Sequence, residues 1–121
     1  MIAKAELAIL DLLWKHGHLT AREIREQIYP NAQKPQHGTV QRLLQRLEEK
    51  GYLSRDRSRS IHFFAATMTR QEYAGRELES LADTLTAGSF TPLITHLVEN
   101  KRISTTEINK LRALLDAHSD Q

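Results

Sequence analysis

The sequence predicts a mainly α-helical protein that carries one short β-hairpin. Apolar residues recur at helical spacing in six segments of the 121-residue chain, whereas residues 52–64 have the composition of two strands around a polar turn. Three helical segments open with Ser or Thr followed three residues later by Glu, a pair whose side chains cap the first turn of a helix. The predicted order is therefore three helices, a hairpin and three further helices.

The helices before the hairpin are predicted over residues 5–15, 20–28 and 37–50, with a loop over residues 31–36. The third helix has the clearest pattern, because its apolar residues recur at i, i+3, i+4 and i+7 and form one stripe: Val40, Leu43, Leu44 and Leu47. Gly51 follows as the residue expected to end it. The opposite face of this helix is polar and is available to a partner.

The hairpin is basic at its tip. Its strands are predicted around residues 52–53 and 61–64, on either side of a polar segment over residues 55–60. Because alternate residues of a strand share a face, we expect three arginines to lie together: Arg55, Arg57 and Arg59. Three helices followed by a basic hairpin form the layout of a winged helix-turn-helix, whose third helix enters the major groove of DNA.

The three helices after the hairpin are short, and their apolar faces need a partner to be buried. Ser89 is expected to cap the second of them, and Ser104 opens the third. We therefore predict a winged-helix DNA-binding domain over residues 1–68 and a helical dimerisation region over residues 69–121. The residues expected to form the core of a homodimer are Leu78, Leu81, Leu85, Leu93, Leu97, Ile108, Leu111 and Leu115.

Charge is divided between these two parts. Residues 1–68 contain 11 Lys and Arg against 7 Asp and Glu, whereas residues 69–121 contain 6 against 8. A basic front and an acidic back indicate that only the front meets a polyanion. The chain has no cysteine and no apolar run approaching the ~18 residues that span a bilayer. We therefore expect a cytoplasmic protein without membrane insertion.

Double-stranded DNA is the predicted partner of the third helix and the hairpin. Arg pairs bidentately with guanine, Gln pairs with adenine, and the Thr methyl group contacts that of thymine. The residues predicted to read bases are Thr39, Gln41, Arg42 and Gln45, and those predicted to bind phosphate are Lys34, His37, Arg46, Arg55, Arg57 and Arg59. The alternative is that this helix face is only solvated and that the arginines serve solubility.

The sequence contains no arrangement typical of an enzyme. It has no glycine-rich phosphate loop, its six histidines form no metal-binding pattern, and the adjacent Glu48 and Glu49 are interpreted as solvating a helix end. We therefore predict no catalytic activity, no metal and no cofactor. Two other functions stay open: a winged helix used as a protein–protein interaction module, and an enzyme whose site is assembled only by the fold.

Several stretches of the sequence resemble motifs of a known family. Residues 5–14 read Ala-Glu-Leu-Ala-Ile-Leu-Asp-Leu-Leu-Trp, residues 39–51 run from Thr-Val to Glu-Glu-Lys-Gly, and residues 88–99 and 111–115 carry paired apolar residues. In order and spacing they are similar to the opening helix, recognition helix and dimerisation region of the penicillinase repressors of BlaI/MecI type. The resemblance extends over about residues 3–116.

The resemblance implies a homodimeric transcriptional repressor on a dyad operator, with the C-terminal helices of two subunits interlocked. For family members that respond to β-lactams, it also implies a membrane sensor-transducer protease pathway. That pathway ends in cleavage of the repressor within its dimerisation region, which separates the subunits. The bond of this chain that aligns with the cleaved Asn-Phe bond is His96–Leu97.

The sequence departs from the family pattern at further positions. The residue before the first helix is Ala3 instead of Ser or Thr, so we expect the first turn to fray. The recognition helix opens with His37, Gly38 and Thr39, and a glycine there costs about 1 kcal/mol of helix stability. The copper-responsive branch uses cysteines that this chain lacks. The family's operator sequence and copper sensing are therefore not carried over.

Overall fold

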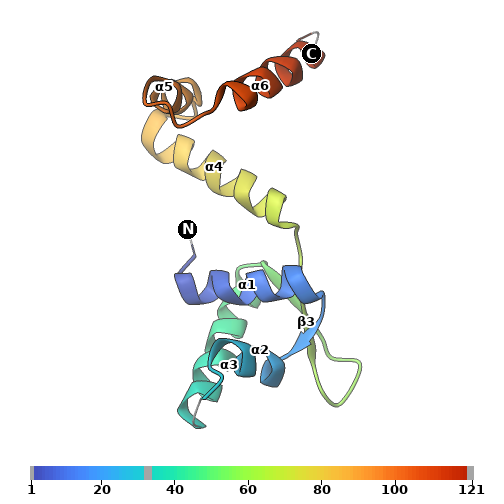
Figure 1. Cartoon of the computed structure of the whole chain (residues 1–121). Coiled ribbons are helices and arrows are strands. Elements are labelled where there is room, and N and C mark those ends of the chain that lie inside the picture. The colour runs from blue at the N-terminus through green and yellow to red at the C-terminus, as the bar shows by residue number, and fades with distance from the viewer. Residues whose placement is uncertain (1, 32–33, 120–121) are drawn as a thin grey trace. The chain divides into compact units, whose positions relative to one another are not determined.

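A computed structural model describes residues 2–31 and 34–119, apart from the side chains of residues 34–37. The described residues form six helices and three strands (Figure 1). In chain order they are α1 (Lys4–His16), β1 (Leu19–Thr20), α2 (Ala21–Ile28), α3 (Lys34–Glu49), β2 (Leu53–Asp56), β3 (Phe63–Ala66), α4 (Arg70–Thr86), α5 (Thr91–Glu99) and α6 (Thr105–Ala117). The predicted mainly α-helical winged helix-turn-helix followed by three helices is confirmed. None of the described helices is both long and apolar enough to cross a membrane.

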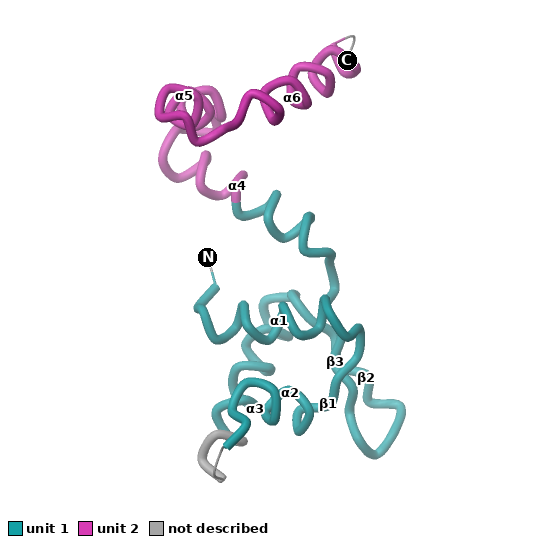
Figure 2. Tube along the Cα trace, in the orientation of Figure 1, with its two compact units in different colours: residues 1–77 teal, residues 78–121 magenta. Residues whose placement is uncertain are grey.

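The chain divides into two compact units, residues 1–77 and residues 78–121 (Figure 2). The start of α4 belongs to the first unit because Tyr73 is buried there, with its ring centroid 5.7 Å from those of Trp14 and Tyr52. The sequence places the domain boundary earlier, after residue 68, where the hairpin pattern ends. The packing of the first unit therefore extends into α4 beyond the last strand.

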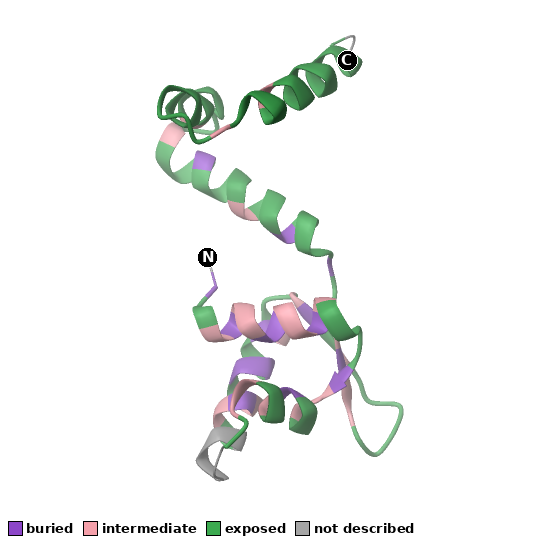
Figure 3. Ribbon diagram, in the orientation of Figure 1, coloured by how far each residue is buried: buried purple, intermediate pink, exposed green. Residues whose placement is uncertain are grey.

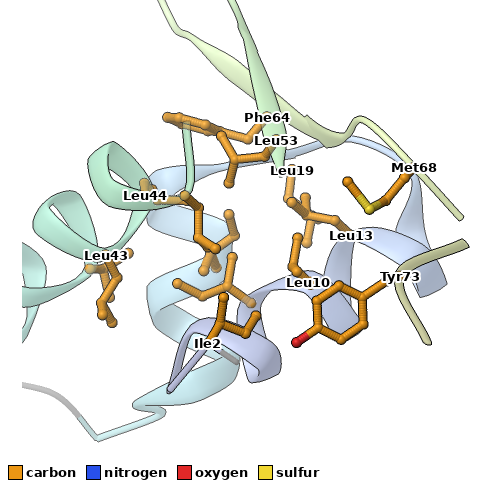
Figure 4. Packing of buried hydrophobic residues seen from close by; sticks show 14 residues of the cluster. Ile2, Leu10, Leu13, Leu19, Leu43, Leu44, Leu53, Phe64, Met68 and Tyr73 are labelled. Carbon is orange, nitrogen blue, oxygen red and sulfur yellow. The ribbon is translucent and has the colours of Figure 1, made fainter. Parts of the chain in front are cut away.

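The core of the first unit is built around the apolar stripe of α3, whose residues are all buried: Val40, Leu43, Leu44 and Leu47. Figure 4 shows Leu43 and Leu44 packed in one cluster with Leu10 of α1, Leu53 of β2 and Phe64 of β3. Burial of one leucine side chain contributes roughly 1.5–3 kcal/mol to folding. The stripe therefore determines which face of α3 points inward and which face points outward.

The sheet has three antiparallel strands in the order β1-β3-β2, one strand more than the predicted hairpin. Phe64 occupies its centre, because it pairs with Leu19 of β1 on one side and with Arg55 of β2 on the other. Only 2% of Phe64 is exposed. The central strand thereby ties the wing, which we define as residues 53–66, to the segment that opens α2.

Three predicted capping positions are confirmed. Each hydroxyl oxygen accepts a hydrogen bond from the backbone N–H three residues later, as the preferred geometry of a helix N-cap requires. The donor–acceptor pairs are Glu23 to Thr20 at 3.2 Å, Glu72 to Thr69 at 3.1 Å and Glu107 to Ser104 at 3.1 Å. These bonds explain why α2, α4 and α6 begin where the sequence predicts.

Two other helix starts differ from the prediction. α3 begins at Lys34, within the predicted loop, because Pro35 falls in the first turn, where its missing N–H leaves no helical hydrogen bond unmade. Ser89 does not cap α5, which begins at Thr91 after Phe90. Here too a proline, Pro92, lies in the first turn and fixes the backbone for helix formation.

The weak cap of α1 is compensated by the side chain of Glu6. The helix begins at Lys4, and the backbone N–H of Ala3 donates to Glu6 Oε1 at 3.3 Å. The other carboxylate oxygen accepts a hydrogen bond from Lys50 Nζ, also at 3.3 Å, although Glu6 itself is only 3% exposed. Glu6 thus offsets the missing Ser or Thr cap, because it holds the helix start and the residue after α3 together.

Gly51 and Gly75 offer a matched test of the backbone. Gly51 ends α3 with a φ of +83°, whereas Gly75 lies inside α4, and an added Cβ meets nothing within 4 Å at either position. We expect Gly51→Ala to lower the free energy of unfolding by about 1–2 kcal/mol, because φ is left-handed. We expect Gly75→Ala to raise it by up to about 1 kcal/mol, because alanine favours helix. Urea denaturation at one protein concentration measures both, and a change of the same sign in both variants would contradict this explanation.

Candidate nucleic-acid interface

The outward face of α3 carries the residues predicted to read bases. Arg42, Gln45 and Arg46 are exposed, whereas Thr39 and Gln41 are half-buried at the edge of the same face. Gln45 Nε2 donates to Glu49 Oε1 at 3.2 Å, one turn further along the helix. Within the described part of the chain, Arg42 and Arg46 form no ion pair, so two guanidinium groups are available to an anionic ligand.

Lys34 and His37 lie in the first turn of α3. Their side chains are outside the described residues, so their predicted phosphate contacts stay predictions. The structure does place both backbones at the N-terminal end of α3. Helix N-termini favour anions, because the first N–H groups are unpaired and the helix dipole is positive there.

The wing arginines do not share one strand face, contrary to the expectation from their alternation. β2 ends at Asp56, so Arg57 and Arg59 lie in the turn that follows the strand. Arg55 alone is on the strand, with 19% of its side chain exposed and its Cζ 4.7 Å from the centroid of the Phe64 ring. Arg59 Cζ lies 5.9 Å from the Phe63 ring in the same way. Alternation did not predict this because the strand is shorter than the charged segment.

The wing turn is held by Asp56. Its Oδ1 accepts a hydrogen bond from the Ser58 backbone N–H at 2.9 Å. Hydrogen bonds from the Ser58 side chain and backbone lower the pKa of Asp56 below its usual value. Asp56 is therefore a carboxylate at neutral pH, and this local contact with Ser58 is retained until the pH falls through the lowered pKa.

Glu48 is the site residue that the sequence interpretation missed. Its Oε2 lies 3.1 Å from Arg57 Nη2 and its Oε1 lies 3.6 Å from Arg55 Nε, while 25% of its side chain is exposed. The sequence contained one signal: Glu48 lies four residues after Leu44 and next to Leu47, at the edge of the buried stripe. That position turns its side chain toward β2, which the adjacent Glu49 does not share.

A groove runs between the wing and the start of α2. The predicted base-reading residue Gln41 lines it together with exposed Ile61 of the wing turn. The full lining comprises Thr20, Ala21, Arg22, Gln41, Arg55, Ser60, Ile61, His62 and Phe64. The arrangement brings amide, hydroxyl and guanidinium groups from β1, α2, α3 and the wing to one surface, which suits contacts with a polyanionic backbone.

The residues predicted to form the dimer core are on the surface of the single chain (Figure 3). Leu93 and Ile108 are half-buried and the other six are exposed, up to 66% for Leu85 and 67% for Leu115. Among the described residues, every exposed large apolar side chain except Ile61 lies between residues 78 and 115. His96 and Leu97, at the aligned cleavage position, are exposed within α5.

The fold and this surface define the class of protein: a winged-helix protein with a cationic face on its third helix. The chain belongs to the penicillinase repressor family, which it matches over residues 2–117. This is a family of transcriptional repressors and not of enzymes. The resemblance to this family that the sequence motifs indicate is thereby confirmed.

Individual relatives agree with this assignment. The penicillinase repressor of Bacillus licheniformis is 26% identical over 121 residues, covering 99% of this chain and 93% of the relative. The methicillin resistance regulatory protein MecI of Mammaliicoccus sciuri is 24% identical over 116 residues, covering 95% and 93%. Among solved structures, RosR of H. salinarum superposes with a TM-score of 0.52 at 17% identity, covering 84% of this chain and 94% of that one. That last likeness concerns the fold alone.

Proposed function

We propose that the protein is a homodimeric transcriptional repressor that binds a dyad operator in double-stranded DNA through α3 and the wing. Membership of the penicillinase repressor family supports repression as the function. The observation that carries the DNA-binding part is the outward face of α3, where Arg42 and Arg46 are exposed without an ion pair in the described chain. The fold can form without an unpaired cationic face on α3. Binding to a polyanion such as DNA, by contrast, uses cationic side chains that are available to phosphate.

Base reading is assigned to Arg42 and Gln41, with Thr39 and Gln45 beside them. Arg42 is exposed and has the five donors that match guanine bidentately. Gln45 donates to Glu49 in the free protein. In the complex its amide gives up this hydrogen bond and pairs with adenine instead. Arg42 and Gln45 lie near the middle of the outward face of α3, and Thr39 and Gln41 lie at its two edges, so in this proposal the four residues face one major groove.

Phosphate binding is assigned to Arg46 on α3 and to Arg57 and Arg59 in the wing turn. All three are exposed, so their donors can reach a DNA backbone. Lys34 and His37 complete the set at the N-terminal end of α3. Arg55 is more enclosed than the others, because it stacks on Phe64, and we assign it to the base of the wing.

Dimerisation is assigned to the apolar surface of residues 78–121. Exposed apolar patches of this extent mark an interaction surface, and a second copy of the chain covers it in this proposal. Two α3 helices in such a dimer are expected about 34 Å apart, one turn of DNA, which matches the two halves of a dyad operator.

Relief of repression through a membrane sensor-transducer protease requires a cut that separates the subunits. The aligned bond, His96–Leu97, lies in α5, and the carbonyl of His96 accepts a hydrogen bond from the Asn100 backbone N–H at 3.0 Å. A bond in a helix is reached by a protease only after local opening. Cleavage there in this proposal therefore depends on how strongly the dimer stabilises α5.

Replacing Arg42 tests base reading. On a duplex selected from random DNA by the wild-type protein, Arg42→Ala is expected to weaken binding by about 1–3 kcal/mol and to relax selectivity at one base pair. Arg102→Ala removes the same charge outside the proposed DNA interface and serves as the control, provided that light scattering gives it the same mass as the wild type. Titrations with the selected duplex and its single-base variants measure both effects. An equal loss on every sequence would make Arg42 a phosphate contact, and no loss would remove α3 from the interface.

Replacing Leu97 tests the dimer. An aspartate in the proposed subunit core leaves a buried charge unpaired, so Leu97→Asp is expected to change the species in solution from twice 13.9 kDa to 13.9 kDa. Ile61→Asp is the control, because Ile61 is also a large apolar residue on the surface, 61% exposed against 38% for Leu97, but lies in the wing. Light scattering at micromolar concentration distinguishes the two masses. A monomeric wild type, or a Leu97→Asp variant that stays dimeric, would contradict the assignment.

A further inference from the structure

Beside the apolar packing of the wing on α3, one carboxylate of α3, that of Glu48, contacts two arginines of the wing. We propose that Glu48 is a positioning residue for DNA binding, which fixes the Arg57 guanidinium at the base of the wing turn in readiness for a phosphate. The inference rests on the proposed function, because it assumes that the wing meets DNA. Glu48 itself does not touch the DNA in this proposal and acts through Arg57.

Arg55, which lies nearer the core, contacts Glu48 and holds its carboxylate in place. That arginine is 19% exposed, stacks 4.7 Å from the Phe64 ring centroid and has its Nε 3.6 Å from Glu48 Oε1. A guanidinium enclosed in this way keeps its charge and needs a nearby carboxylate. Glu48 is therefore held by a partly buried contact, which solvent screens less than a fully exposed ion pair.

The position of Arg57 is then set by Glu48. Arg57 follows the last residue of β2, Asp56, which pairs with Phe63, so no strand pairing fixes Arg57. Its Nη2 lies 3.1 Å from Glu48 Oε2, and 57% of its side chain remains exposed. One of five N–H donors is enough for this contact, which leaves others directed at solvent and available to a phosphate oxygen.

Holding Arg57 before binding has a definite consequence for affinity. Immobilising a long side chain at an interface costs about 0.5–1.5 kcal/mol. Because Glu48 already orders the Arg57 side chain in the folded protein, this entropy is not lost again when DNA binds. Loss of the contact is therefore expected to weaken DNA binding by about two- to tenfold, the same free energy expressed as a ratio.

Simple electrostatics predicts a change in DNA affinity of the opposite sign, so the direction of the change distinguishes the two explanations. Removing a negative charge beside a DNA site strengthens attraction to phosphate. Glu49 is the matched control, because it is the next residue of α3, is exposed and contacts Gln45 instead of the wing. Its substitution removes the same charge and can free the Gln45 amide for a base, but it cannot release Arg57. Glu48→Gln and Glu49→Gln remove the same charge from adjacent positions, and only the first releases Arg57.

The experiment measures the affinity of the full-length chain for the selected duplex over a range of salt concentrations. The variants are Glu48→Gln, Glu49→Gln, Arg57→Gln and the double variant Glu48→Gln/Arg57→Gln. We expect Glu48→Gln to bind about two- to tenfold more weakly than wild type, and Glu49→Gln to bind as tightly as wild type or more tightly. In the Arg57→Gln background, the Glu48 substitution is expected to have no further effect, because its target is gone.

Three outcomes would overturn the inference while leaving the proposed function intact. The first is Glu48→Gln binding as tightly as Glu49→Gln. The second is a loss that persists in the Arg57→Gln background, which would place the effect in Arg55 or in folding, and thermal unfolding of each variant separates these two. The third is wild-type affinity in Arg57→Gln itself. Absence of DNA binding by the wild type at low salt would instead reject the proposed function.

Discussion

The structure depends first on burial of the apolar stripe of α3. Val40, Leu44 and Leu47 have no exposed surface, so the helix cannot rotate about its axis without exposing leucine. Each buried leucine contributes roughly 1.5–3 kcal/mol, which far exceeds any single polar contact on the opposite face. The orientation of Arg42 and Arg46 is therefore a consequence of the core and not of local hydrogen bonds.

Two sets of contacts extend this constraint to the neighbouring elements. Phe64 pairs with both outer strands and supports Arg55, so the wing and the core share one aromatic ring. At the other side of the first unit, Arg70 Nη1 lies 2.7 Å from Asp11 Oδ1 and its Cζ lies 4.8 Å from the Trp14 ring. These contacts fix the start of α4 to the same unit that carries α3. The part that binds DNA in our proposal is thus one packed body through residue 77.

Most of the fold was predictable from the sequence because it follows local patterns. Residues close together in the chain determine the apolar stripe of α3 and the left-handed glycine after it. The same holds for the helix caps at Thr20, Thr69 and Ser104. The start of α3 is an exception, because Pro35 indicates a loop by its residue type but lies in the first turn of the helix. The third strand lies outside the predicted hairpin, since Leu19 becomes a strand residue through pairing with Phe64, 45 positions away.

The candidate site was less predictable, because it depends on contacts between elements. Periodicity identified the outward residues of α3, including Arg42 and Gln45. It places Glu48 at the edge of the buried stripe but does not reveal that its carboxylate contacts Arg57, or that β2 ends before Arg57, since both follow from how the strand leaves the helix. Alternation of charge predicts a shared face only for as long as the strand continues.

The central claim is that the face of α3 opposite the core enters the major groove of DNA in each half of a dimer. A crystal structure of the protein with a dyad duplex tests it most directly. We expect two α3 helices about 34 Å apart, with the Arg42 guanidinium within hydrogen-bond distance of a base edge. A complex in which this face points to solvent, or in which a single chain binds without its partner, would contradict it.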